Sequence, residues 1–153
     1  IPYPGGDVPR ETGVCTDVVI RTLRAVGIDL QRAVYEDRKA FPQRYVINGK
    51  SSPRDRNIDH RRVPNQQIWF RHHAQTVALD ADYQAGDIVT WKLPGNLDHT
   101  GVVSDRRVAG RLLILHNIGR GAQEEDVLNA WPITGHFRLR ASLTVARAVA
   151  NGD

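Results

Sequence analysis

The sequence predicts an α+β fold, in which N-terminal helices pack on a small antiparallel β-sheet. Apolar residues recur at helical spacing in the first half of the chain, and short apolar runs separated by turn residues follow Gly86. Helices that precede strands, rather than alternate with them, are typical of this class. The 153 residues, 41% hydrophobic and 25% charged, predict one domain over residues 1–153 with its own core.

Two helices are predicted after an N-terminal loop. Residues 1–14 are rich in proline and glycine, which favours a loop. Apolar residues at helical spacing predict a helix from Thr16 to Gly27, a glycine that suits the end of a helix. Residues 29–40 predict a second helix, and Pro42 lies just beyond its end.

A polar, turn-rich stretch over residues 48–62 predicts a long loop, and such loops in compact domains often carry function. Pro64 suits the first turn of a third helix, which we expect over residues 65–74. Residues 141–153 are expected to be either a short terminal element or a loose tail. The predicted strands are residues 87–93, 99–104, 111–116 and 136–140.

Charge and composition narrow the classes of partner. Lysine and arginine number 21 against 17 acidic residues, so the net charge is +4, which suits an anionic partner such as a cell wall. The chain has no RNA-recognition signature, and we expect no nucleic-acid partner. No apolar run approaches the ~18 residues that a membrane span needs. Because the chain has no methionine, we expect Ile1 to follow a removed segment, either a signal peptide or upstream domain sequence.

The single cysteine, Cys15, excludes an internal disulfide and a Cys-rich zinc site. It lies one residue before the predicted first helix, where unpaired N–H groups and the helix dipole favour a thiolate. A thiolate nucleophile also needs a base, usually histidine, and a third group that orients the base. The alternative is that Cys15 is a small buried apolar residue, as free cysteines often are.

Two of the six histidines are placed to serve such a nucleophile. His99 begins a predicted strand and His116 ends the next one, and a hairpin brings these two positions to the same edge of the sheet. If the Cys15 helix packs across that sheet, its N-terminus faces both rings. One histidine would then be the base and the other would orient it.

The chain resembles the NlpC-type cell-wall endopeptidases of the papain-like cysteine peptidase superfamily. Those proteins show Tyr-x-x-Gly-Gly, then a cysteine that opens a helix, a Gly-Asp strand, a His-x-Gly strand and a polar residue that ends the next strand. The corresponding residues here are Tyr3, Gly5, Gly6 and Cys15, then Gly86-Asp87-Ile88-Val89, His99-Thr100-Gly101-Val102 and Ile114-Leu115-His116.

More narrowly, the chain is similar to a family of uncharacterised bacterial envelope proteins that share the stretches GVCTD, IDHRRVPN and HNIGxG, here at residues 13–17, 58–65 and 116–121. The sequence departs from the NlpC-type pattern on both sides of Cys15, and it has one residue fewer between Tyr3 and Gly5. The aspartate before the nucleophile is Val14, and the Ser-Gly after it is Thr16-Asp17. Asp17 in the first helical turn suits the helix dipole, but close to a thiolate it opposes ionisation.

The resemblance implies a papain-like fold and a cysteine-dependent amide hydrolase, an endopeptidase or amidase, that cleaves peptidoglycan stem peptides without a cofactor. Cys15 would be the nucleophile, His99 the base and His116 the orienting residue. Asn117 is the substitute for His116, and because neighbours on a strand point to opposite faces, only one of the two can reach His99. The resemblance also implies a periplasmic or secreted location, and we expect a monomer.

Further residues are candidates for contacts with the substrate. The backbone N–H of Cys15 and the Tyr3 hydroxyl would hold the oxyanion. Arg120, in a Gly-Arg-Gly turn after His116, could flank the cleft. An arginine-bearing cleft suits substrate carboxylates, and the loop candidates that could form it are Arg56, Asp59, His60, Arg61 and Arg62. Asp59 and Arg61 could instead pair with each other and only fix the loop.

Three alternatives stay open at this point. The first is a zinc hydrolase that uses His60, His99 and His116 with Asp59 or Asp98, although a compact His-Glu-x-x-His spacing is absent. The second is a non-catalytic wall-binding module with the same fold. The third is acyl transfer in place of hydrolysis. A housekeeping enzyme and an antibacterial effector are both compatible with the sequence, and an effector would have an immunity or inhibitor protein as partner.

Overall fold

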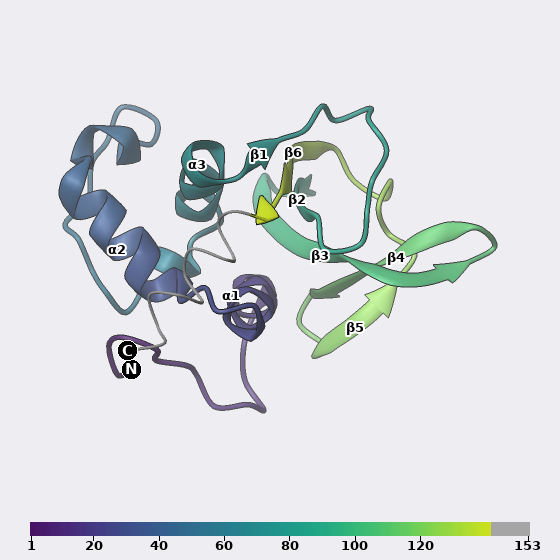
Figure 1. Cartoon of the computed structure of the whole chain (residues 1–153), viewed down its shortest axis with the longest axis horizontal. Helices are drawn as coiled ribbons and strands as arrows, with labels where there is room; N and C mark the ends of the chain where they lie inside the picture. Colours follow the sequence, from purple (N-terminus) through teal and green to yellow (C-terminus); the bar gives the residue numbers. More distant parts are fainter. Residues whose placement is uncertain (142–153) are drawn as a thin grey trace.

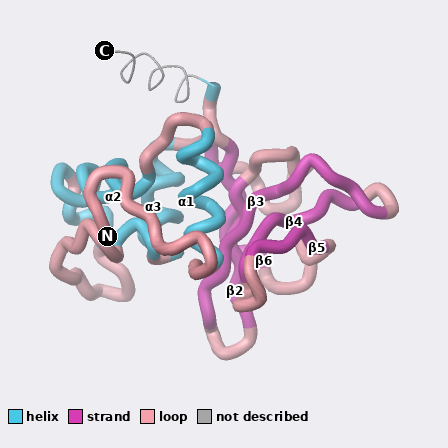
Figure 2. The backbone as a smooth tube through the Cα atoms, turned by 90° about the horizontal axis from the view of Figure 1, so that it is seen from below, coloured by secondary structure: helices cyan, strands magenta, loops and turns pink. Residues whose placement is uncertain are grey.

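The computed structural model describes residues 1–141 and confirms the α+β class. Its helices gather on one side of an antiparallel sheet, with α1 beside the strands (Figure 1, Figure 2). The predicted terminal element or tail lies outside the described residues, apart from residue 141. The helices are α1 (Cys15–Ala25), α2 (Leu30–Ala40) and α3 (Val63–His73), and two 3₁₀ turns are η1 (Pro42–Tyr45) and η2 (Asp59–Arg61).

The sheet has the strand order β1-β6-β2-β3-β4-β5, and all neighbouring strands are antiparallel. The four predicted strands are confirmed as β2, β3, β4 and β6, although β3 is twice as long as predicted and β6 begins three residues earlier and ends two residues earlier. The two strands that the sequence did not predict, β1 and β5, are short and polar. The bounds are β1 (Gln75–Thr76), β2 (Ile88–Leu93), β3 (Leu97–Val108), β4 (Arg111–Asn117), β5 (Ala122–Glu125) and β6 (Ile133–Arg138).

The helix boundaries follow from local capping. Helix α1 begins at Cys15 itself, one residue earlier than predicted, because the Asp17 carboxylate accepts the Val14 backbone N–H at 2.8 Å and closes the first turn there. Asp29 caps α2 through its side chain, which accepts from the N–H groups of Gln31 and Arg32.

The hydrophobic core has two parts, one on each face of the sheet. Side chains alternate along a strand, so Ile88 contributes to the part beneath the helices and Val89 to the part on the far face. Val102 and Val103 divide in the same way. Trp91 is fully buried in the far part. Within residues 1–141, no helix is both long enough and apolar enough to cross a bilayer.

Candidate functional site

The loop before Cys15 is held from two sides. Asp17, which is buried, takes a bidentate pair from Arg61 of η2, with Nε and Nη2 at 3.0 and 2.9 Å. The Asn117 side chain, at the end of β4, donates to the carbonyl oxygen of Gly13 at 3.1 Å. Gly13 has φ +144°, a conformation that favours glycine. These contacts fix the position of the thiol relative to both η2 and the sheet.

Burial raises the pKa of the Cys15 thiol above its ordinary value. Backbone N–H groups of Thr100 and Thr16 favour the thiolate and oppose this shift, whereas the negative charge of Asp17 adds to it. The helix N-terminus therefore does not produce the low thiol pKa expected from the sequence. The free protein holds Cys15 as a neutral thiol at neutral pH.

This raised pKa predicts how Cys15 reacts with a small neutral alkylating agent. The alkylation rate is expected to rise with pH and to reach its midpoint above that of free cysteine, since only the thiolate reacts. Cys15 is the only cysteine, so mass spectrometry of the intact chain at several pH values measures the rate directly. A plateau already reached at neutral pH would contradict the expectation.

The structure brings His99, His116 and Glu125 together as a line of hydrogen bonds. Nε2 of His99 lies 2.8 Å from Nδ1 of His116, and Nε2 of His116 lies 3.2 Å from a carboxylate oxygen of Glu125. Because that carboxylate can only accept, Nε2 of His116 carries a proton, and in a neutral ring its Nδ1 then accepts from Nε2–H of His99. A neutral His99 is left with its lone pair on Nδ1. With both rings neutral, the arrangement therefore fixes the tautomer of each ring.

The two rings are enclosed by aromatic side chains. His99 is 3% exposed and His116 is 1% exposed, and the Trp131 ring lies edge-on to His99 with centroids 5.6 Å apart. Burial, and to a lesser degree the charge of His116, lowers the pKa of His99 to about 4. His99 is therefore a neutral acceptor at neutral pH.

Cys15 meets β3 at the residue after His99, but no hydrogen bond joins its sulfur to the His99 ring, which packs with Trp91 and Trp131 in the part of the core on the far face of the sheet. The backbone N–H of Thr100, the residue after His99, interacts with the sulfur instead. Thr100 and Asp98 alternate with His99 along β3, and Asp98 shares a cavity with Cys15. The predicted convergence of Cys15, His99 and His116 is thus confirmed for the two rings, whereas the thiol reaches only the neighbouring backbone.

Gly101 explains the His-x-Gly spacing. A Cβ at this position would lie 2.8 Å from Cγ2 of Ile114 and 3.1 Å from Cβ of His116, both on the adjacent strand β4. Any side chain would push β4 away from β3. Glycine is therefore needed for the close approach that places His116 against His99.

The sequence did not single out Glu125. It ends β5, whose four residues AQEE lack the apolar alternation that predicts a strand. Pairing of β5 with β4, with Gln123 opposite His116 and Glu125 opposite Ile114, places the carboxylate beside the His116 ring. Arg120 lies near the same carboxylate, with N and O atoms 3.7 Å apart, and its side chain is 70% exposed. Arg120 thus belongs to the Glu125 end of the line rather than to the cavity.

If the line of hydrogen bonds serves catalysis, Glu125 acts through His116 as a positioning residue. Glu125→Ala is expected to lower kcat about 10- to 100-fold with KM unchanged, and Glu125→Gln, which keeps an acceptor oxygen, is expected to restore most of the loss. The measurement is kcat and KM from steady-state hydrolysis of wall peptides by each variant. Glu124→Ala is the matched control, because Glu124 pairs with Ser104 and Arg106 instead. Equal rates for the Glu125→Ala and Glu124→Ala variants would contradict a positioning role.

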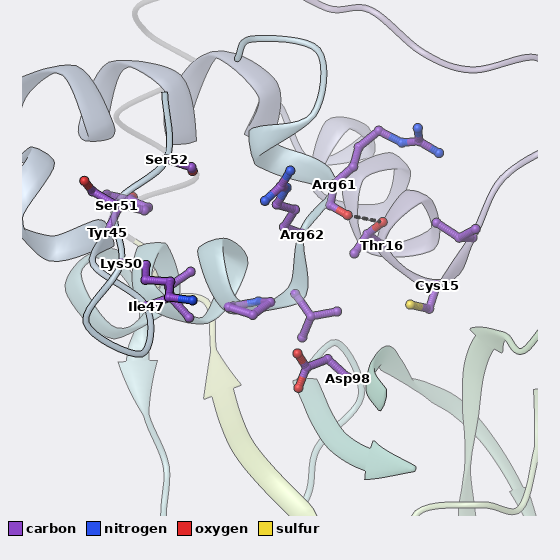
Figure 3. A pocket seen from close by; sticks show the side chains of 13 residues that line it. Cys15, Thr16, Tyr45, Ile47, Lys50, Ser51, Ser52, Arg61, Arg62 and Asp98 are labelled. Atoms are coloured by element: carbon purple, nitrogen blue, oxygen red, sulfur yellow. Dashed lines mark hydrogen bonds between the residues drawn. The ribbon is translucent and has the colours of Figure 1, made fainter. Parts of the chain in front are cut away.

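A cavity of about 470 Å³ opens beside Cys15 (Figure 3). Its walls come from the start of α1, the turn between η2 and α3, the segment from Tyr45 to Ser52, and Asp98 at the start of β3. It is large enough for a short peptide segment. The charged residues along its wall are Lys50, Arg61, Arg62 and Asp98.

Two candidate residues for substrate contact are placed elsewhere. The Tyr3 hydroxyl donates to Glu36 on α2 at 3.1 Å, and its ring packs edge-on against Tyr35, so the prediction that it holds an oxyanion is wrong for this conformation. His60 is only 1% exposed, and burial lowers its pKa to about 4. Its ring lies in the interior and does not line the cavity, so the prediction of a substrate contact at His60 is also wrong.

Three further residues named in the sequence analysis, Asn117, Asp59 and Arg56, contact other parts of the fold than the candidate catalytic site. His116, and not Asn117, reaches His99, and Asn117 holds the Gly13 loop instead. Asp59 does not pair with Arg61; it forms a buried ion pair with Arg38 of α2. The polar loop is fixed as expected, but by two ion pairs to α1 and α2. Arg56 lies over the Tyr3 ring, away from the cavity lining.

The zinc alternative required His60, His99 and His116 to share a metal. In residues 1–141 no group of three or more His, Cys, Asp or Glu side chains is arranged to hold a metal ion. Ring nitrogens of His99 and His116 face each other, and His60 is buried apart from them. These residues therefore do not form the ligand set that this alternative requires.

Sequence comparisons place the chain in a family. The family model described as "Domain of unknown function (DUF1287)" matches residues 1–139. The chain is also 54% identical over 140 residues to "Uncharacterized protein YijF" of Escherichia coli (strain K12). The aligned region covers 89% of this chain and 68% of that protein. The chain belongs to the DUF1287 family. The expected membership of an uncharacterised family with bacterial members is therefore confirmed, while the envelope location remains a prediction.

Proposed function

We propose that this protein is a cysteine-dependent amide hydrolase with an NlpC-type, papain-like site, and that it cleaves stem peptides of peptidoglycan in the cell envelope. The observations that carry the proposal are the line Glu125–His116–His99 and, at the backbone of the residue after His99, a cysteine that opens a helix on a cavity wall. Nucleophile, base and orienting group follow in the order that the NlpC-type resemblance implies. The peptidoglycan substrate rests on that resemblance.

In the proposed reaction, substrate binding brings the Cys15 thiol and the His99 ring together, since catalytic hydrogen bonds often form only in the substrate complex. The thiol proton moves to Nδ1 of His99 as the sulfur attacks the amide carbon. Nε2 of His99 keeps its proton and donates to His116. The backbone N–H of Cys15, which lacks an intrahelical acceptor, is the donor proposed for the oxyanion.

The tetrahedral intermediate then breaks its carbon–nitrogen bond, and the His99 proton passes to the leaving amine. A thioester on Cys15 remains. Water attacks the thioester while His99 takes its proton, and the acid product leaves as the thiol is restored. The neutral His99, with its pKa of about 4, is ready to accept at neutral pH but does not ionise the thiol before substrate binds.

The test is a digest of purified peptidoglycan with wild-type protein and with Cys15→Ala, with products identified by mass spectrometry. The proposal expects peptide fragments with new carboxyl and amino termini from wild type alone. Thermal unfolding of both proteins checks that each is folded. Identical digests, with no fragments released by either protein, would overturn the assignment to wall peptides.

A further inference from the structure

The cations around the Cys15 cavity differ in whether their charge is already neutralised. Arg61 is held by the bidentate pair with Asp17, so its charge is balanced inside the wall. Asp98, the one acidic residue among the lining residues, pairs with Lys92. Lys50 and Arg62 are exposed and have no acidic partner among the described residues. The cavity therefore presents two uncompensated positive charges.

The positions of these two cations are fixed by backbone structure. Lys50 ends a tight turn through Asn48 and Gly49, with φ +52° and +73°, in which Ile47 and Lys50 exchange backbone hydrogen bonds of 2.9 and 3.0 Å. Arg62 is the residue that precedes α3, and its carbonyl oxygen accepts from the N–H of Gln66. Both side chains thus start from ordered backbone in the wall of the cavity that Cys15 also lines, with Lys50 across the cavity from Cys15 and Arg62 between them (Figure 3).

We propose that Lys50 and Arg62 form a carboxylate-binding subsite, which selects amides that carry a free carboxylate close to the bond attacked by Cys15. Arginine offers a planar fork that matches a carboxylate, and lysine adds a compact charge. The exposed hydroxyl group of Ser51, in the same wall, adds a neutral donor. The amide as substrate rests on the proposed function, whereas the preference of the cavity for a negatively charged group does not.

The test compares two alkylating agents of similar size at the same pH. Iodoacetate carries a carboxylate and iodoacetamide is neutral, and in both reactions the Cys15 sulfur displaces iodide from a carbon atom. The ratio of the two rates cancels the fraction of thiolate, so it reports the charge around the sulfur. Because Cys15 is the only cysteine, the intact mass gives both rates.

The wild-type ratio is expected to exceed that of free cysteine. Arg62→Gln and Lys50→Gln are each expected to lower it roughly threefold, and the double variant roughly tenfold, as expected for loss of nearby charges in partly aqueous surroundings. Arg71→Gln is the matched control, since Arg71 is an exposed arginine on α3 outside the cavity lining. An unchanged ratio in the double variant overturns the subsite.

A second measurement joins the subsite to hydrolysis. If wall peptides are cleaved, Arg62→Gln is expected to raise KM for peptides with a free carboxylate and to leave KM unchanged for the same peptides with that carboxylate amidated. Equal effects on both peptides overturn the selectivity. If the digest shows no cleavage but the alkylation ratio falls in the variants, the hydrolase assignment fails and the anion subsite stands.

Discussion

Replacing His99 with alanine is expected to lower kcat/KM for wall peptides by 10²- to 10⁴-fold, close to the effect of losing Cys15. General acid–base catalysis contributes in this range, and residues that act as one unit lose most of their effect when either is removed. His99 is the ring whose Nδ1 lone pair is left free by the hydrogen bond to His116. Quantified fragment release from peptidoglycan measures the effect.

The control for this variant is His72→Ala, because His72 is an exposed histidine on α3 away from the cavity lining. His99 is buried, so His99→Gln is a second variant that keeps most of the volume and a polar group. Thermal unfolding shows whether each variant keeps its fold. Activity of a folded His99→Gln variant within about tenfold of wild type would rule out His99 as the base.

Replacing Asp87 with alanine is expected to lower the free energy of unfolding by about 3–5 kcal/mol, because the buried His136 ring and the partly buried Arg138 guanidinium lose the carboxylate that pairs with them. Asp87 is 1% exposed and is held by Arg138 through two contacts of 2.8 Å and by Nε2 of His136 at 2.6 Å. This cluster joins the start of β2 to β6. Urea unfolding followed by circular dichroism measures the loss.

The cluster of Asp87, Arg138 and His136 also makes the free energy of unfolding depend on pH. Burial raises the pKa of Asp87, but hydrogen bonds from Arg138 and His136 outweigh it and leave that pKa below its ordinary value of 3.8. The stabilisation by Asp87 is therefore fully present at pH values above 3.8, the ordinary pKa, and is lost as the pH falls through the lowered pKa of the folded protein.

Asp126→Ala is the matched control for Asp87→Ala, since the ion pair of Asp126 with Arg111 is exposed and worth about 0–1 kcal/mol. Equal losses for both variants would contradict the prediction.

Much of the fold could be predicted because the signals are local. Helical spacing and capping residues gave the three helices to within two residues, and alternating apolar runs gave four strands. The short strands β1 and β5 could not be predicted, because their residues are polar and pair only through the edges of the formed sheet. Their position is decided by tertiary structure.

The candidate site also contains residues that could be predicted from the sequence and residues that could not. His99 and His116 could be predicted to meet, because hairpin geometry connects the start of one strand to the end of the next. The position of Glu125 could not be predicted, because it depends on strand β5, which the sequence pattern did not reveal. The position of Tyr3 depended on Gly6, where a Cβ would lie 2.0 Å from the Pro2 carbonyl oxygen, and on contacts with α2. The thiol pKa depended on burial, which a sequence pattern near a helix start does not report.

The last two residues of β4 serve opposite sides of the sheet. His116 holds the His99 ring, and Asn117 holds the loop that carries the nucleophile. A small shift of this strand end would carry ring and loop in the same direction, so their spacing changes less than their common position in the molecule.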